Sequence, residues 1–388
     1  MKLAKNLERL GTETAFSVLA EAKKLEAQGK EMIHLGLGQP DFKTPQHIMD
    51  AAKKAIDDGH HGYVLANGIL ECRQAVTRKI KKLYNKDISP ERVMIMPGGK
   101  PTMYYAIQMI GEPGAEIVHP TPGFPIYESM INYTGAKAVA YDLTEDKDLK
   151  FNPEKILSLI TDKTRLVILI NPNNPTGSFV EKPVIDYFAK ELEKHPHVTI
   201  LSDEIYSRQI FDYKEMPSFF HYEALKDRLI VLEGWSKAYS MTGWRLGWSY
   251  WPKEMVAHVN KLLINSVSCV NAAAQFAGIA ALDGPDDSIN DMLDKFTLRR
   301  NLIHKGLNDL PGIECSLPGG AFYAFPKVKG TGMTGSEFCK KAMHEAGVAI
   351  VPGTAFGKTC QDYVRFSFAA SRDNIQQALE NIGKMLSK

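Results

Sequence analysis

Short apolar runs rich in β-branched residues alternate with longer amphipathic stretches along most of the chain. The runs are Val93–Met96, Glu116–His119, Ala136–Tyr141, Arg165–Ile170, Val198–Ser202, Leu229–Leu232 and Leu246–Tyr250, and helix-like stretches such as Pro101–Ile110, Pro153–Ile160 and Glu181–Glu193 lie between several of them. This alternation predicts β-α-β units, and therefore an α/β fold with a mostly parallel central sheet and helices on both faces. Leu166–Ile170 is apolar throughout, which is typical of a strand covered on both sides.

The pattern changes after residue 285, where a smaller α+β unit is predicted. Its expected elements are a helix at Ser288–Asn308, the Pro-Gly-rich stretch Pro311–Gly320, strands at Ala321–Pro326, Val348–Val351 and Tyr363–Phe368, and helices at Thr334–Ala346 and Asp373–Ser387. A helix followed by Met32–Gln39 precedes the sheet, and we expect it to pack on this unit or on a partner. We therefore predict a large domain at 46–285, and a small domain made of 1–45 and 286–388 that includes an N-terminal arm.

Composition narrows the class of protein. The 388 residues suggest two or three domains of about 150 residues, and the elements above favour two. Lys and Arg together number 47 and Asp and Glu 45, so the formal net charge is +2. This balance argues against a nucleic-acid-binding protein, although it leaves room for a local cationic site that binds a small anion.

The cysteines and the N-terminus carry little chemistry. The five cysteines contain no C-x-x-C pair, so we expect no metal site and no disulfide framework. The first ten residues are charged and amphipathic, unlike a signal peptide, and no run reaches the roughly 18 to 20 apolar residues of a membrane span. We therefore expect a cytoplasmic protein without a membrane partner.

Polar and glycine-rich residues gather just after the predicted strands. They are Gly98-Gly99-Lys100, Pro120–Phe124, Asn171–Gly177, Asp203–Tyr206 and Gly234–Lys237, with Arg245 eight residues further on. Ligands of open α/β sheets bind beyond the carboxyl ends of the strands. The sequence therefore predicts a site at this edge, formed by amide, carboxylate, phenol, amine and guanidinium groups.

The Gly98-Gly99-Lys100 segment resembles a nucleotide-binding P-loop only in part. The upstream glycine of that motif is replaced by Met94, Pro101 follows the lysine where Ser or Thr is required, and no G-x-G-x-x-G follows a strand. A Gly-Gly turn that enters a helix, with Pro101 at its first position, remains. Its free amides suit one phosphate group, although a plain tight turn is an equal alternative.

Asp203 and Lys237 are the strongest candidates for chemistry. Asp203 ends an apolar strand, so its carboxylate needs a donor or a cation, such as the protonated ring nitrogen of an aromatic cofactor. Tyr206 could reach a phenolic oxygen on the same ring; the alternative is that Asp203 caps a turn and Tyr206 packs. Most lysines are solvated, but Lys237 beside Arg245 could have a lowered pKa and form an imine.

Four other segments offer groups that could bind an anion or act as a nucleophile. Arg245 could grip a phosphate, and Asn174, in the rigid turn Asn171–Gly177, could donate to a phenolate or carboxylate or be purely structural. Arg365 interrupts an apolar strand, which indicates either a carboxylate clamp or a snorkelling edge residue. The Gly234–Ala238 segment lacks the closing glycine of a nucleophile elbow and no histidine is marked as its base, so a serine hydrolase is disfavoured.

Taken together, these residues resemble the class I/II pyridoxal-phosphate-dependent aminotransferases, and within them the bacterial aspartate-aminotransferase-like group. The resemblance extends from Gly36–Phe42 to Val364–Ser367, and its most specific parts are Asn171–Gly177, Ser202–Tyr206, Ser236-Lys237 and Met241–Gly247. It implies the fold of the fold type I enzymes, a pyridoxal 5'-phosphate cofactor, and transfer of an amino group between an amino acid and a 2-oxo acid.

The resemblance also implies a role for each site residue. Lys237 would form the internal aldimine and move the proton between Cα and C4′, and Asp203 would keep the pyridinium nitrogen protonated. Tyr206 and Asn174 would bond the phenolic oxygen of the ring. The amides of Gly99 and Lys100, with Ser236 and Arg245, would bind the cofactor phosphate. Phe124 would stack on the cofactor ring. Arg365, with Asn174 and the backbone near Gly38, would bind the substrate α-carboxylate.

Tyr63 matches a tyrosine that reaches the phosphate from the neighbouring subunit, which implies a homodimer with shared active sites. Two positions depart from the pattern: Gly234 stands where many members have a serine, and Phe124 replaces the commoner Trp or Tyr. Lys100 matches a lysine that helps to bind the distal carboxylate of aspartate or glutamate. This favours acidic substrates, although a surface role for Lys100 is the alternative.

Other functions remain open on the same scaffold. A different reaction, such as β-elimination from cysteine S-conjugates, or an aromatic or broad substrate range, would use the same lysine. A regulator that uses the fold as a sensor would need an added DNA-binding segment, and only about 30 residues precede the family pattern. We therefore expect an enzyme that acts on small molecules and binds no nucleic acid.

Overall fold

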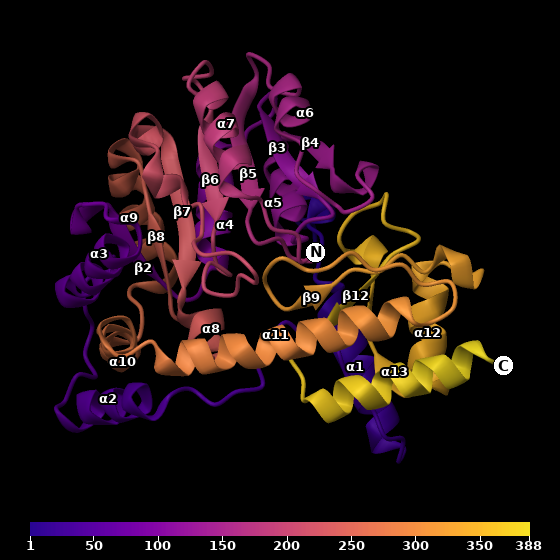
Figure 1. Ribbon diagram of the computed structural model, residues 1–388. Coiled ribbons are helices and arrows are strands. Elements are labelled where there is room, and N and C mark those ends of the chain that lie inside the picture. The colour runs from indigo at the N-terminus through magenta and orange to yellow at the C-terminus, as the bar shows by residue number, and fades with distance from the viewer.

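The computed structural model describes residues 1–388 and contains a central seven-stranded sheet (Figure 1). Its strands lie in the order β2 (Val93–Met96), β8 (Gly247–Tyr250), β7 (Leu229–Gly234), β6 (Thr199–Asp203), β5 (Thr164–Ile170), β3 (Glu116–Thr121) and β4 (Lys137–Asp142). The pairings among β3 to β7 are parallel, and β8 is antiparallel to both of its neighbours. The prediction of a mostly parallel sheet is confirmed.

Helices cover both faces of this sheet. One face carries α3 (Leu70–Tyr84), α6 (Pro153–Ser158), α7 (Lys182–Leu192) and α10 (Ala272–Asp283), and the other carries α4 (Lys100–Ile110), α5 (Ile126–Thr134) and α9 (Lys253–Val267). Strand β5 shows why its sequence is apolar throughout: Val167 and Leu169 pack in the first layer, and Leu166, Ile168 and Ile170 in the second. Successive side chains of a strand point to opposite faces, so both sets are buried.

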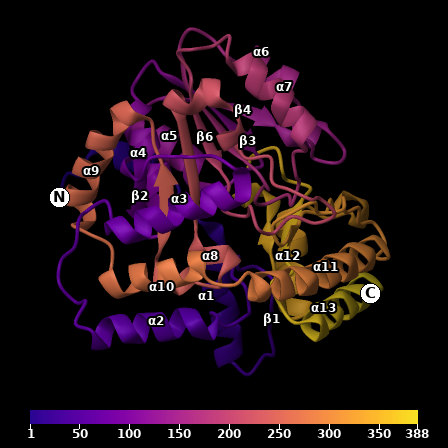
Figure 2. The same ribbon diagram turned by 60° about the vertical axis from the view of Figure 1, so that its left-hand side comes forward.

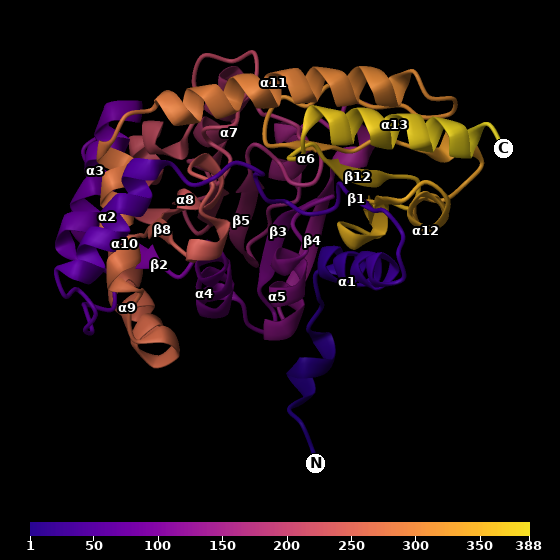
Figure 3. The same cartoon turned by 90° about the horizontal axis from the view of Figure 1, so that it is seen from below.

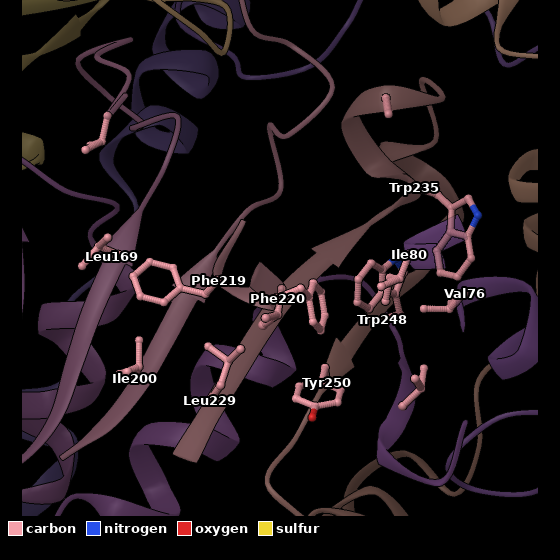
Figure 4. Close-up of a cluster of buried hydrophobic side chains, with 14 of the residues drawn as sticks. Val76, Ile80, Leu169, Ile200, Phe219, Phe220, Leu229, Trp235, Trp248 and Tyr250 are labelled. Carbon is pink, nitrogen blue, oxygen red and sulfur yellow. The ribbon is translucent and has the colours of Figure 1, made fainter. Parts of the chain in front are cut away.

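Large aromatic side chains fill the core of the first face beside β6, β7 and β8. Figure 4 shows Phe219, Phe220 and Trp248 among the aliphatic side chains of this cluster. Helix α2 (Gln46–Asp57) forms a further layer, and α10 lies between α2 and α3 (Figure 2). The short helix α8 (Trp235–Ala238) follows β7 directly and carries the candidate lysine.

The C-terminal part has its own core and two small sheets. The sheets are β11 (Val351–Pro352), β12 (Val364–Ser367) and β9 (Tyr323–Ala324) in that order, and β1 (Ile33–His34) with β10 (Val348–Ala349). Helices α11 (Asp287–Asn308) and α13 (Arg372–Leu386) lie side by side along one side of this part, and α12 (Gly335–Glu345) lies close by (Figures 1 and 3). The predicted α+β character of this part agrees with the structure, whereas the exact domain boundaries stay a prediction.

The N-terminal residues join this C-terminal unit. Ile33–His34 pairs in parallel with Val348–Ala349, and α1 (Thr14–Ala27) packs beside β10 and β11. The residues before α1 lead away from it (Figure 3), and the short helix Lys5–Arg9 lies beside α5. Of the two expected locations for the N-terminal segment, the structure therefore shows packing on the C-terminal unit.

Several predicted boundaries were wrong. Val348–Val351 was expected to form one strand, but it divides between two sheets, and only Tyr323–Ala324 of Ala321–Pro326 is a strand. Helix α4 begins at Lys100, so Pro101 is its second residue. Tertiary pairing decides such short strands, because two residues carry too little periodicity to assign. None of the helices combines the length and the apolar character needed to span a bilayer.

Candidate active site

A cavity of about 600 Å³ lies at the carboxyl ends of β5, β6 and β7. Eleven of the twelve predicted site residues line it: Gly38, Gly99, Lys100, Phe124, Asn174, Asp203, Tyr206, Ser236, Lys237, Arg245 and Arg365. They come from both ends of the chain and from loops after different strands. The parallel strands bring those loops to one edge, as the sequence predicted.

Tyr63 lies outside this cavity. Its side chain is 92% exposed and lines a separate hollow of about 720 Å³ together with Trp244 and Asn271. The expectation for Tyr63 concerns the site of a neighbouring subunit, so its role stays a prediction.

Asp203 is a buried carboxylate with two donors. Tyr127, in the first turn of α5, donates its hydroxyl to Oδ2 at 2.7 Å, and the backbone N–H of Ile205 donates to Oδ1 at 3.2 Å. Burial raises the pKa of Asp203 to about 6, against the influence of the two hydrogen bonds and of Lys237. One oxygen therefore caps the local turn, while the carboxyl as a whole faces the cavity and stays ionisable near neutral pH.

Lys237 projects into the cavity from α8. Its Nζ donates to the carbonyl of Gly38 at 2.5 Å and lies 5.7 Å from the ring centre of Tyr206. Burial, together with the charges of Arg365 and Arg245, lowers the pKa of Lys237 to about 8. The sequence pointed to Arg245 as the cationic neighbour, whereas Arg365 has the larger effect. An amine with this pKa is partly neutral at pH 7 and can act as a nucleophile.

Arg365 is buried in β12 without a carboxylate partner. Its Nη1 donates to Asn174 Oδ1 at 2.8 Å and its Nη2 to the Gly36 carbonyl at 2.6 Å, while its buried Nε has no partner. The rings of Tyr323 and Phe356 lie 4.5 Å from the guanidinium carbon. The alternative of a snorkelling edge residue is therefore wrong. A buried guanidinium with an unused donor is suited to an incoming carboxylate.

The turn Asn171–Gly177 fixes Asn174 in place. The side chain of Asn171 closes the turn, because its Nδ2 donates to the Val180 carbonyl at 3.1 Å and its Oδ1 accepts from Val180 N–H at 2.9 Å. Gly177 has φ +70°, and a Cβ there would lie 2.4 Å from the Tyr323 carbonyl oxygen. Both features make the turn rigid, and Asn174 can present its amide to Arg365 and to the cavity.

Five residues form a corner suited to a phosphate. Helix α4 begins with Gly99 as an N-cap that offers no side-chain hydrogen bond. Pro101 has no N–H and the Thr102 N–H donates to the Gly99 carbonyl at 3.1 Å, so the N–H groups of Gly99 and Lys100 are the ones left for a ligand. Gly98 has φ +87°, and a Cβ there would lie 2.2 Å from Nη2 of Arg245. The guanidinium therefore packs against bare backbone, with Ser236 and Lys100 lining the same cavity. A phosphate here, a ring nitrogen at Asp203 and an aldehyde at Lys237 fit pyridoxal phosphate.

Tyr206 is held by a partner that the sequence did not mark. Its hydroxyl and that of Tyr323 are 2.9 Å apart, and burial raises the pKa of Tyr206. Tyr323 also lines the cavity, together with Glu13, Phe16 and Leu19 from the N-terminal segment. Sequence reasoning missed these residues and Tyr127. None of them carried a usable pattern, because their contacts join segments that are far apart in the sequence.

Comparison with known proteins gives consistent results. Residues 30–382 match the family model of aminotransferase class I and II. The chain is 34% identical to aspartate aminotransferase of Bacillus subtilis (strain 168), with all of both chains covered. The structure is similar to the crystal structure of the Rhizobium meliloti aspartate aminotransferase, with a TM-score of 0.94, 30% identity, and coverage of 100% of this chain and 99% of that one. Alanine aminotransferase from Pyrococcus furiosus gives a TM-score of 0.93, 32% identity and full coverage of both chains.

Proposed function

The chain belongs to the class I and II aminotransferase family, and we propose that its amino donors are the acidic amino acids aspartate and glutamate. It is a pyridoxal-phosphate-dependent transaminase that moves an amino group between an amino acid and a 2-oxo acid. The resemblance and the fold class predicted from the sequence are thereby confirmed. The bound cofactor supplies an electron sink for the substrate carbanion, and the protein supplies position and charge.

We assign the chemical roles from the geometry of the cavity. Lys237 would hold the cofactor and then remove and return the proton at the substrate Cα. Asp203, supported by Tyr127, would pair with the cofactor ring nitrogen and keep it protonated. Arg365, steadied by Asn174, binds the α-carboxylate through its unused donors and so fixes the direction of the Cα–H bond.

The choice of acidic donors rests on one observation: a second cation, Lys100, lines the cavity together with Arg365. An amino acid with two carboxylates could then pair with both cations, whereas a monocarboxylic one would use Arg365 alone. The relatives from B. subtilis and R. meliloti are named aspartate aminotransferases, which supports this choice. The similar enzyme from P. furiosus is named an alanine aminotransferase, so neutral donors are the competing possibility.

A half-reaction screen tests the donor class. Single amino acids are added to the holoenzyme without an oxo acid, and the conversion of the cofactor absorbance band is followed. We expect conversion by aspartate and glutamate at lower concentrations than by alanine or tyrosine. Reaction with neutral donors alone would refute the acidic assignment, and release of ammonia and pyruvate from a cysteine S-conjugate without an acceptor would indicate the β-elimination alternative.

We also propose a homodimer that places Tyr63 at the phosphate of the neighbouring subunit. The exposed Tyr63 lines an open hollow with apolar Ile56, Trp244 and Ala273, a surface that a second copy would cover. Sedimentation gives the oligomeric state. Mixing Tyr63→Phe chains with Lys237→Ala chains tests whether each active site takes Tyr63 from the other subunit. If it does, a mixed dimer contains one site in which Lys237 of the first chain and Tyr63 of the second are both intact, and activity appears that neither variant has alone. We further propose a cytoplasmic location, which cell fractionation would test.

A further inference from the structure

One carboxylate in the cavity has no role in the chemistry above. The charged residues that line the cavity are the cations Lys100, Lys237, Arg245 and Arg365 and the anions Asp203 and Glu13. Asp203 has its proposed partner in the cofactor ring. Glu13 comes from the N-terminal segment, and its carboxylate requires a separate explanation.

Glu13 forms an ion pair with Lys100, the cation assigned to the distal carboxylate of the substrate. Glu13 is the N-cap residue of α1, yet its side chain makes no hydrogen bond to that helix. The Lys100 Nζ also lies 5.7 Å from the ring centres of both Phe16 and Phe124. The Glu13 side chain is 19% exposed and the Lys100 side chain 46%, so the pair lies at the cavity wall and is partly open to solvent.

The charge of Glu13 is felt inside the cavity. It acts to raise the pKa of Lys237 and of Arg365, in each case against the larger effect of burial. Glu13 therefore lies close enough to the substrate-binding groups to affect an incoming anion.

The segment that carries Glu13 is attached on both sides. Before it, Arg9 donates to the carbonyls of Asn132 and Tyr133, at 2.7 and 2.9 Å, and the Gly11 N–H donates to Ser129 Oγ at 2.9 Å. After it, α1 packs beside β10 and β11. These attachments hold the Glu13 carboxylate beside Lys100 when no substrate is present.

We propose that Glu13 is a specificity-determining residue that competes with the distal carboxylate of the substrate for Lys100. The inference rests on the proposed donor class and deepens it. With an acidic donor, the distal carboxylate of the substrate takes the place of Glu13 at Lys100. The displaced Glu13 carboxylate stays nearby, and the two carboxylates repel each other. With a neutral donor, Glu13 stays paired, so that Lys100 is not left as an unpaired charge beside an apolar side chain. Glu13 thus weakens the binding of acidic donors and permits neutral ones.

The test compares wild type, Glu13→Gln and a matched control, Glu21→Gln, as holoenzymes. Glu21 lies on the same helix but pairs with His344 at 3.3 Å and does not line the cavity. Calorimetry measures the binding of succinate and propionate, which have two carboxylates and one. We expect Glu13→Gln to bind succinate about five times more tightly, the upper end for a partly exposed ion pair, and propionate within about twofold of wild type.

The half-reaction rates give the same comparison with reacting substrates. Glu13→Gln is expected to raise kcat/KM for aspartate relative to alanine by about fivefold, whereas Glu21→Gln leaves the ratio unchanged. An unchanged ratio, or equal changes for succinate and propionate, would overturn the proposal and leave Glu13 with a structural role only. If Glu13→Gln fails to fold, Glu13→Ala replaces it, because it also removes the carboxylate: the proposal requires that variant to bind succinate more tightly than wild type while propionate binding stays unchanged.

Failure of the proposed donor class gives a different result. An enzyme that reacts with alanine but not with aspartate, as wild type and as Glu13→Gln alike, would refute acidic donors. The ratio of succinate to propionate binding would then decide the role of Glu13 by itself.

Discussion

Replacing Tyr127 by Phe removes one hydrogen bond from the carboxylate that we assign to the cofactor ring. Tyr127 Oη donates to Asp203 Oδ2 at 2.7 Å, and both groups are buried. A hydrogen bond to a charged group contributes about 1.5 to 3 kcal/mol. Its loss disfavours the ionised carboxylate and increases the affinity of Asp203 for a proton about 10- to 100-fold.

The direction of the pH effect follows from this change. In the wild-type protein the pKa of Asp203 is about 6, so the carboxyl is mostly ionised at pH 7. In Tyr127→Phe the pKa rises further, and a higher pH is needed to ionise the group. A protonated Asp203 cannot hold a proton on the cofactor ring nitrogen. With the pKa moved to about 7 to 8, the ionised fraction at pH 7 falls about 2- to 10-fold, so we expect cofactor affinity at pH 7 to fall by the same factor and to recover toward the wild-type value as the pH rises.

The assay is a titration of the stripped apoprotein with pyridoxal phosphate between pH 5.5 and 9, followed by absorbance. Tyr141→Phe is the matched control, because the buried Tyr141 hydroxyl donates to the Ile168 carbonyl at 3.0 Å and does not contact Asp203. The acidic limb of the affinity profile should move to higher pH in Tyr127→Phe only. Superimposable profiles for wild type and Tyr127→Phe, or an equal displacement in the control, would refute the reasoning.

Three further predictions concern the other corners of the site. Arg365→Lys, which loses the fork of donors, should lower kcat/KM for amino donors about 100-fold while cofactor binding stays within about twofold; a comparable loss of cofactor binding would contradict the assignment. Because the pKa of Lys237 is lowered to about 8, the rate at which apoprotein takes up cofactor should rise with pH as the amine loses its proton, and then level off above about pH 8. A rate that still climbs at pH 10 would show that the amine keeps the pKa of an ordinary lysine. Gly98→Ala should raise the cofactor Kd about 10-fold or more, because the added Cβ at φ +87° meets Arg245, while Gly114→Ala, at φ +98° with open space around it, serves as a control for backbone strain.

Much of the fold and the site was predictable from the sequence. The apolar run Leu166–Ile170 identified a strand buried on both faces, because only a strand with a layer on each side tolerates apolar side chains at every position. The polar residues that follow successive strands had to meet, since parallel strands end at one edge. Motif spacing then led to Lys237, Asp203 and Asn174 as cavity residues, and all three line it.

Contacts between distant segments were not predictable. Glu13 lies beside Lys100 only because the N-terminal segment is attached to α5 and packs beside β10 and β11, and two-residue strands leave too weak a pattern to indicate that packing. The same holds for Arg365: its sequence context allowed either an edge residue or a carboxylate clamp, and only its burial beside Asn174 and Gly36 excluded the edge.

The sequence by itself therefore determined the layers of the fold, the edge at which the site forms and the residue types available there, because local periodicity and strand direction depend on neighbours along the chain. The tertiary structure alone decided which of those groups are paired and which are left free: Asp203 has Tyr127, Lys100 has Glu13, and Arg365 keeps an unused donor. Burial and pairing set the charge state and the ligand preference of a side chain, and both depend on residues that are far apart in the sequence.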